Sequence, residues 1–154
     1  MEEEFQPGTL LRIKDYEFEN GTTRDKYLII LLKNDESAYI IHTLTTSRNN
    51  PGVKNILRGC STHQNRFPYY CFPAGEEIDG NGFYFEKDTF IFFLNNINKV
   101  DMAVFQKYHL QPFGMVGLAV LPKLELKRLL KCILKSKFVP NNLKSELSTF
   151  KDTL

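Results

Sequence analysis

Apolar residues form short blocks in the front part of the chain and a helical stripe near its end. Two of the blocks, at residues 27–32 and 89–94, are apolar without a break, which is typical of strands covered on both faces. Other segments rich in β-forming residues lie at 9–13, 38–44 and 83–85, with weaker signals at 16–18, 56–57 and 69–72. The front of the chain is therefore predicted to form about five to seven short strands.

Helices are predicted in three places, all behind the strands. Asp101 is a suitable N-cap for a helix that ends near His109. Pro122 suits the first position of a second helix, which ends before Pro140. The apolar stripe of this helix has the 3–4 spacing of one helix face and consists of Leu126, Leu129, Leu130, Ile133 and Leu134. A weaker helix is predicted from about Asn142.

Polar and glycine-containing segments separate these elements. The pair Asn20-Gly21 is a turn signal, so residues 15–24 are predicted to form a loop. Residues 60–82 are predicted to be a long excursion, and loops of that length are often functional. The chain shows no repeat and no linker, so residues 1–154 are interpreted as one domain with an α+β fold. Its strands are expected to close into a small, strongly bent sheet or barrel beside the helices.

Composition places only loose limits on function. A net charge of +2 and a pI near 8.4 allow nucleic-acid binding only through a local patch. No apolar run reaches the roughly 18–20 residues of a membrane helix, and the start MEEEFQPG is unlike a signal peptide, so no membrane partner is expected. Three cysteines without a CxxC pair predict no disulfide framework and a cytoplasmic location. Cys60, His63 and Cys71 lack a fourth ligand, so neither a metal nor another cofactor is expected.

The hairpin predicted from residues 22–50 carries most of the candidate functional residues. Antiparallel pairing brings the start of its first strand next to the end of its second. Arg24 and Lys26 stand at that start, and the end of the second strand carries Thr45, Thr46, Ser47 and Arg48. Cations beside hydroxyls form an anion-binding rim. The ordinary alternative is solvated cations with threonines that serve strand and turn structure, and both interpretations stay open at this point.

A second group of candidates lies in the long excursion. His63 and Arg66 precede Tyr69 and Tyr70, and basic groups interleaved with aromatic rings can hold unpaired bases. The pKa of an ordinary imidazole suits proton transfer, so His63 is a candidate general acid or base. The alternative is a structural loop packed by its own aromatic rings. His42 lies in an apolar strand and is better interpreted as a core histidine.

The order of these segments resembles the MazF/PemK (Kid) superfamily of toxin–antitoxin modules over about residues 8–110. The resemblance rests on a glycine-led strand, an apolar second strand, a strand that ends in Thr before a basic loop, and a later apolar strand that leads to an aspartate. These segments are GTLLRI from Gly8, KYLIIL from Lys26, YIIHTLTTSR up to Arg48, EKDTFIFF from Glu86 and INKVD up to Asp101.

The resemblance implies a small SH3-like β-barrel with C-terminal helices, here at about residues 122–150. It also implies a homodimer that a cognate antitoxin neutralises. The implied activity is cleavage of single-stranded RNA without metal, by attack of the 2′-hydroxyl on the adjacent phosphate. That chemistry requires a base, a cation on the phosphate and an acid for the leaving oxygen.

Position by position, Thr45 matches the strand-end threonine that acts with the family's arginine. That arginine falls on Lys26, which lacks the bidentate fork of arginine, and Arg24 is the alternative cation. The implied catalytic set, with His63 added from its chemistry, is Lys26, Arg24, Thr45 and His63. The implied RNA-binding set is Arg24, Lys26, Thr46, Ser47, Arg48 and Arg66.

Besides Lys26 in place of the arginine, three further departures from the family pattern leave a second function open. No proline follows Lys26, residues 60–82 are inserted, and Phe93 and Asn95 stand where the PemK branch has an arginine and an aspartate. The alternative function is a non-catalytic module of the same fold that binds RNA or a protein.

Overall fold

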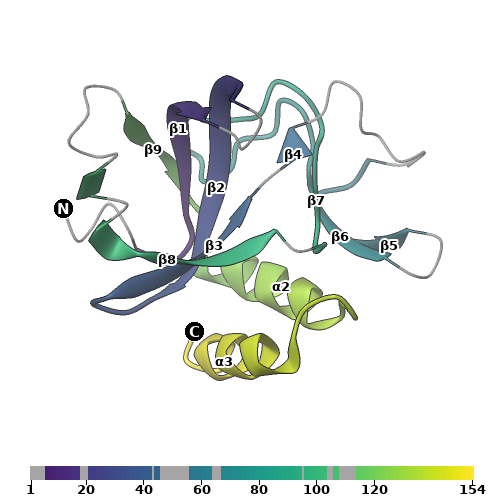
Figure 1. Ribbon diagram of the computed structural model, residues 1–154. Coiled ribbons are helices and arrows are strands. Elements are labelled where there is room, and N and C mark those ends of the chain that lie inside the picture. Colours follow the sequence, from purple (N-terminus) through teal and green to yellow (C-terminus); the bar gives the residue numbers. More distant parts are fainter. Residues whose placement is uncertain are drawn as a thin grey trace.

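The computed structural model describes residues 6–17, 21–42, 44–45, 56–63, 67–94, 96–103, 106–107 and 114–154. This part of the chain has an α+β fold with two antiparallel sheets and two C-terminal helices (Figure 1). Of the predicted helix from Asp101 to about His109, residues 102–103 and 106–107 are helical and the others after residue 103 lie outside the described residues.

The larger sheet has five strands in the order β8-β3-β2-β1-β9. Its members are β8 (Ile97–Asp101), β3 (Ser37–His42), β2 (Thr23–Lys33), β1 (Thr9–Glu17) and β9 (Met115–Val120). Both faces of its centre are buried, because alternate residues of β2 enter two separate apolar clusters. This double burial explains why the sequence of β2 is apolar without a break.

The smaller sheet has four strands in the order β4-β7-β6-β5. Its members are β4 (Leu44–Thr45), β7 (Thr89–Phe92), β6 (Phe67–Phe72) and β5 (Gly59–His63). Strand β4 begins two residues after the end of β3, so the chain passes from the first sheet to the second at this point. The second strand of the predicted hairpin is thus divided between the two sheets.

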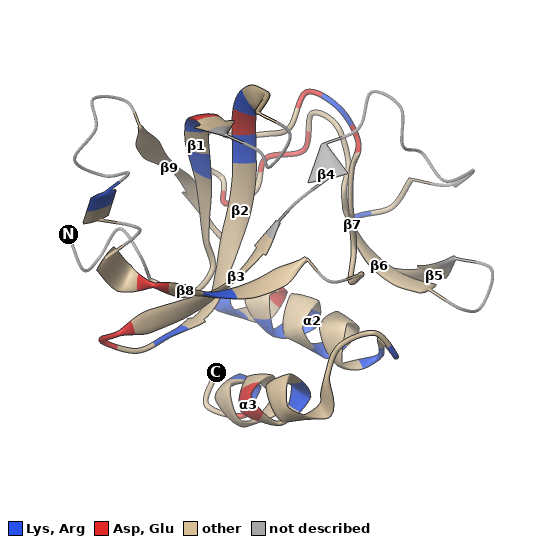
Figure 2. Cartoon of the chain, in the orientation of Figure 1, with Lys and Arg blue, Asp and Glu red and all other residues tan. Residues whose placement is uncertain are grey.

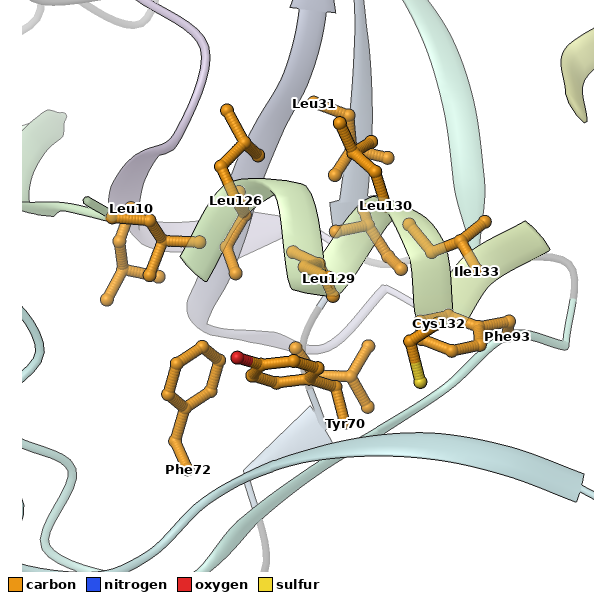
Figure 3. Close-up of a cluster of buried hydrophobic side chains, with 14 of the residues drawn as sticks. Leu10, Leu31, Tyr70, Phe72, Phe93, Leu126, Leu129, Leu130, Cys132 and Ile133 are labelled. Atoms are coloured by element: carbon orange, nitrogen blue, oxygen red, sulfur yellow. The ribbon is translucent and has the colours of Figure 1, made fainter. Parts of the chain in front are cut away.

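Helix α2 (Lys123–Leu134) joins both sheets through one core, and α3 (Asn141–Lys151) packs on α2. The predicted stripe is buried in this core at Leu126, Leu129, Leu130 and Ile133. Figure 3 shows these side chains gathered with Leu10 and Leu31 of the first sheet and with Tyr70 and Phe72 of the second. The single core predicts that the sheets and helices fold together.

Gly8 fixes the start of β1 against α2. Its φ is +93°, and a Cβ at this position would lie 3.2 Å from the backbone oxygen of Leu121. Its backbone N–H donates to the oxygen of Ile30, and its oxygen accepts from the N–H of Leu121. Only glycine combines this conformation with so close an approach.

The α+β class, α2 directly after Pro122 and a last helix near Asn142 are confirmed. The closed barrel and the count of five to seven strands are wrong, because the described residues form nine strands in two open sheets. Residues 83–85 and 56–57 are not strands, whereas β5, β8 and β9 were not predicted. Strands β5 and β8 have polar or small residues at many positions, so their apolar pattern is weak.

Within the predicted loop at residues 15–24, residues 15–17 and 23–24 are strand, and the weak strand signal at residues 16–18 is confirmed for residues 16–17. Strand β1 continues to Glu17 and β2 begins at Thr23, so the two strands extend well beyond the apolar part of the sheet. Backbone pairing maintains this extension, since Tyr16 pairs with Arg24 and Glu17 with Thr23. The pairing places the candidate cations on a two-stranded projection.

The prediction that the cysteines form no disulfide is wrong. Cys60 of β5 and Cys132 of α2 are joined by a disulfide, across a sequence separation of 72 residues, and Cys71 is a buried free thiol. The spacing of the cysteines gave no sign of this pair, because tertiary packing alone brings β5 to α2. In the described part of the chain no helix has the length and apolar character needed to cross a bilayer.

Candidate functional site

The end of the β1–β2 ladder carries the predicted cations. Between the pairs Ile13–Lys26 and Tyr16–Arg24, β1 has one residue more than β2, which is a β-bulge. Asp15 in this bulge has φ +52°, and its N–H donates to a carboxylate oxygen of Asp25 at 3.2 Å. The extra residue turns Tyr16 to the face of β2 that carries Arg24 and Lys26.

We call Tyr16, Arg24 and Lys26 the β1–β2 rim. The Nζ of Lys26 lies 3.8 Å from the centre of the Tyr16 ring, a cation–π contact. Burial lowers the pKa of Lys26 from its ordinary value, because desolvation disfavours the ammonium form. Arg24 is exposed. The rim thus offers an exposed cation, a half-buried amine and an aromatic face, amid acidic neighbours (Figure 2).

On the other face of the same two strands lies a cavity that we call the Arg12 cavity. Its volume is about 350 Å³, and it is lined by Arg12, Tyr27, Phe83, Tyr84, Phe85, Glu86, Lys87 and Thr89. The ring of Phe85 makes edge-to-face contacts with the rings of Tyr27, at 5.7 Å, and Phe83, at 5.3 Å. The rings form an aromatic wall beside two cations and one carboxylate.

Arg12 is the electrostatic centre of this cavity. It pairs with Tyr27 across the ladder, and its Nε is buried without a hydrogen-bond partner among the described residues. A buried donor without a partner costs about 1–3 kcal/mol. Because a buried donor needs an acceptor, such as a water, an ion or a ligand, Arg12 is a candidate anion-binding residue.

The structure separates Thr45 from the ladder that holds Lys26. The β2–β3 pairing ends at Leu28 and His42, and Thr45 then pairs with Thr89 in the second sheet. Because Thr89 lines the Arg12 cavity, the backbone of Thr45 lies next to that cavity.

The other predicted site residues are placed only in part or not at all. His63 ends β5, where its backbone pairs with Phe67. The predicted residues Thr46, Ser47, Arg48 and Arg66 lie outside the described residues.

Sequence reasoning missed the Arg12 cavity. One signal was present, because Arg12 interrupts an apolar strand between Leu11 and Ile13. A charged residue on the buried face of a strand is unusual and marks a special environment. No sequence signal joined Arg12 to residues 83–89, since only the fold brings them together.

Comparisons of the chain with known proteins found no match. The chain matches no protein-family model, no curated protein and no solved structure. In the described part of the chain, no three histidine, cysteine or acidic side chains are placed to hold a metal ion. The candidate site therefore rests on its own geometry.

Proposed function

We propose that the chain is a MazF/PemK-type RNA endonuclease toxin that holds single-stranded RNA along the β1–β2 rim. The observation that carries the proposal is the contact of Lys26 with the Tyr16 ring beside exposed Arg24. Cations at a strand end attract phosphates, and an aromatic face accepts an unpaired base of any sequence. The Arg12 cavity, on the opposite face of the same strands, provides a second aromatic surface with a cation for the next nucleotide.

The proposed reaction uses the ribose itself as nucleophile. A base removes the proton of the 2′-hydroxyl, the 2′-oxygen bonds to the adjacent phosphorus, and the bond from phosphorus to the 5′-oxygen breaks. The leaving 5′-oxygen receives a proton, so the products are a 2′,3′-cyclic phosphate and a 5′-hydroxyl. No metal is needed if side chains supply the charge and the proton transfers.

Arg24 would neutralise the phosphate as its charge grows, and Thr45, whose backbone lies beside the Arg12 cavity, would contact the next nucleotide. Burial lowers the pKa of Lys26 and so increases the neutral fraction of its amine, and Lys26 is therefore the proposed base. His63 is the proposed acid. The broader proposal is a homodimeric, cytoplasmic protein that a cognate antitoxin inhibits.

Cleavage of a labelled single-stranded RNA of mixed sequence, in the presence of EDTA, tests the proposal. We expect the wild type to give fragments with cyclic phosphate ends. Arg24→Ala, Lys26→Ala and Thr45→Ala should each lower the rate about 100-fold, as expected when one group that stabilises transition-state charge is lost. The wild-type rate should rise with pH toward the lowered pKa of Lys26, because the neutral amine becomes more abundant, and Lys26→Arg should remove this rise.

Lys127→Ala is the matched control, because Lys127 is an exposed cation on α2. Its cleavage rate should equal that of the wild type. If the wild type neither cleaves nor binds any single-stranded RNA, the proposal is wrong.

A second candidate function is an RNA-binding module without catalysis. It is favoured by the cation–π contact that already engages Lys26 and by the absence of an acid at Asn95. Three observations together would establish this alternative: RNA binds the wild type in a salt-dependent way, RNA binds Arg24→Ala more weakly, and the RNA stays intact.

A further inference from the structure

The disulfide between β5 and α2 is asymmetric in its exposure. Cys60 is exposed, whereas Cys132 is completely buried in the core beneath α2. Cys60 lines a cavity of about 520 Å³ together with Arg58, Gly59, Tyr70, Pro122, Leu124, Glu125 and Arg128. A thiolate that enters this cavity therefore meets the residue Cys60 and not Cys132.

The charges around the cavity leave a positive surplus. Arg58 forms an ion pair with Glu125, in which its Nε donates to a carboxylate oxygen at 2.8 Å, and Tyr70 donates to the same carboxylate at 2.9 Å. The charge of Glu125 is therefore already matched. Arg128 is exposed at the cavity and adds a cation without a matching acid among the cavity-lining residues.

Helix α2 extends this positive field. Besides Arg128, the helix and its C-cap residue carry four exposed lysines. The helix has a single acid, Glu125. These lysines are Lys123, Lys127, Lys131 and Lys135. A positive surface raises the local concentration of small anions and their rate of encounter.

We propose that Cys60 is a thiol–disulfide exchange site for small thiols that carry carboxylates. The thiolate of the incoming molecule attacks the sulfur of Cys60, and a new disulfide forms between them. The Cys60–Cys132 bond breaks, and Cys132 leaves as a thiolate that takes up one proton, which balances the proton released by the incoming thiol. No external oxidant is required, because the disulfide of the protein is reduced as the mixed disulfide forms.

The third cysteine does not compete for this chemistry. Cys71 is buried, and burial raises the pKa of its thiol to about 12, so its thiolate is scarce at neutral pH. A second adduct on Cys71 is therefore not expected in the folded protein.

Exchange would release the covalent connection between the β5–β6 hairpin and the helix. Strand β5 is an edge strand, and without the disulfide the hydrogen bonds of Arg58 and Tyr70 to Glu125 would still attach the hairpin region to α2. The hairpin also carries His63 at the end of β5. The exchange site does not depend on the proposed RNA chemistry, and it supplies a covalent means of loosening this hairpin.

Three probe thiols of similar size but different charge test the proposal on the native protein: thioglycolate, 2-mercaptoethanol and cysteamine. Mass spectrometry with peptide mapping follows the rate and the position of the adduct. We expect the first adduct on Cys60. Arg128→Gln should lower the reaction rate of anionic thioglycolate about threefold or more, leave the rate of neutral 2-mercaptoethanol unchanged and raise the rate of cationic cysteamine. The reason is that a nearby unit charge changes the rate at which a charged thiol meets the cavity by about this factor.

Comparing each thiol with itself in two proteins removes differences in intrinsic thiol reactivity. Lys14→Gln, an exposed cation on β1, is the matched control and should leave all three rates unchanged. A first adduct on Cys132 or Cys71, reaction only after unfolding, or equal effects of Arg128→Gln on the three thiols would each overturn the proposal. Circular dichroism of the variant verifies that it is folded.

Discussion

Arg12 is a single residue whose buried Nε lowers the stability of the fold. Its Nε is buried without a partner among the described residues, and its neighbours in the cavity are largely aromatic. The free energy of folding would favour an apolar residue at this place. This loss of folding free energy has a function if the guanidinium binds a ligand, as the proposed use of the cavity requires.

We predict that Arg12→Met separates stability from binding. Methionine keeps much of the volume and removes the unsatisfied donor, so the free energy of unfolding should rise by up to about 1 kcal/mol. Binding of single-stranded RNA should weaken by about tenfold, since one phosphate contact is lost. Urea unfolding and fluorescence anisotropy provide the two measurements, and a loss of more than about 2 kcal/mol in stability would show that Arg12 is structural.

Hydrogen bonds between side chains of different elements attach the β5–β6 hairpin to α2. Arg58 donates to Glu125 and to the backbone oxygens of Glu77 and Ile78, so one side chain joins α2 to the segment after β6. Tyr70 of β6 donates to the same carboxylate, and burial together with proximity to this carboxylate raises the pKa of Tyr70 above its ordinary range. Glu125 is thus the acceptor shared by two elements.

We expect Glu125→Ala to lower the free energy of unfolding by about 3 kcal/mol, because it leaves a cation and a buried hydroxyl without their acceptor. Tyr70→Phe removes one of these bonds and should lower it by about 1 kcal/mol. Lys127→Ala, on the exposed side of the same helix, should change it by less than about 0.5 kcal/mol. Thermal unfolding under non-reducing conditions measures all three, and equal effects of the first two would contradict the shared-acceptor description.

The largest apolar cluster of the molecule contains residues of both sheets and of the helices. Leu10 and Ile29 come from the first sheet, Tyr70 and Ile91 from the second, and Leu130 from α2. Helix α2 contributes Leu126, Leu129, Leu130, Cys132 and Ile133 to this cluster (Figure 3). The two open sheets are therefore expected to lose their structure together.

We predict that Leu130→Ala lowers stability by about 2–5 kcal/mol, since it creates a cavity at a completely buried position. Unfolding should remain a single transition, with far-ultraviolet circular dichroism and tyrosine fluorescence changing together. Leu124→Ala, at a leucine of α2 that is 60% exposed, is the control and should have little effect. Separate transitions for the two signals would show that the sheets are independent units.

Local patterns explain which predictions were confirmed. The stripe of α2 and its start after Pro122 were visible because helical spacing and proline geometry are properties of neighbouring residues. Strand β2 was visible for the same reason, although its ends were not. Strand β9 was missed, because Met115–Val120 contains a glycine and becomes a strand through its pairing with β1.

The candidate site divides in the same way. The sequence pointed to Arg24 and Lys26 as strand-end cations, and the structure adds Tyr16 through a bulge at Asp15. The expected closeness of Lys26 and Thr45 assumed one continuous hairpin, whereas the second strand changes sheets after His42. A hydrophobic pattern says which residues are buried, but not which partner strand covers them.

The sequence by itself determined the α+β class, the buried second strand and the amphipathic helix after Pro122, because each follows from the spacing of residues close together in the chain. Only the tertiary structure decided the two open sheets, the cavity around Arg12 and the disulfide between Cys60 and Cys132. Each of these joins segments far apart in sequence, and their meeting depends on the packing of the whole core.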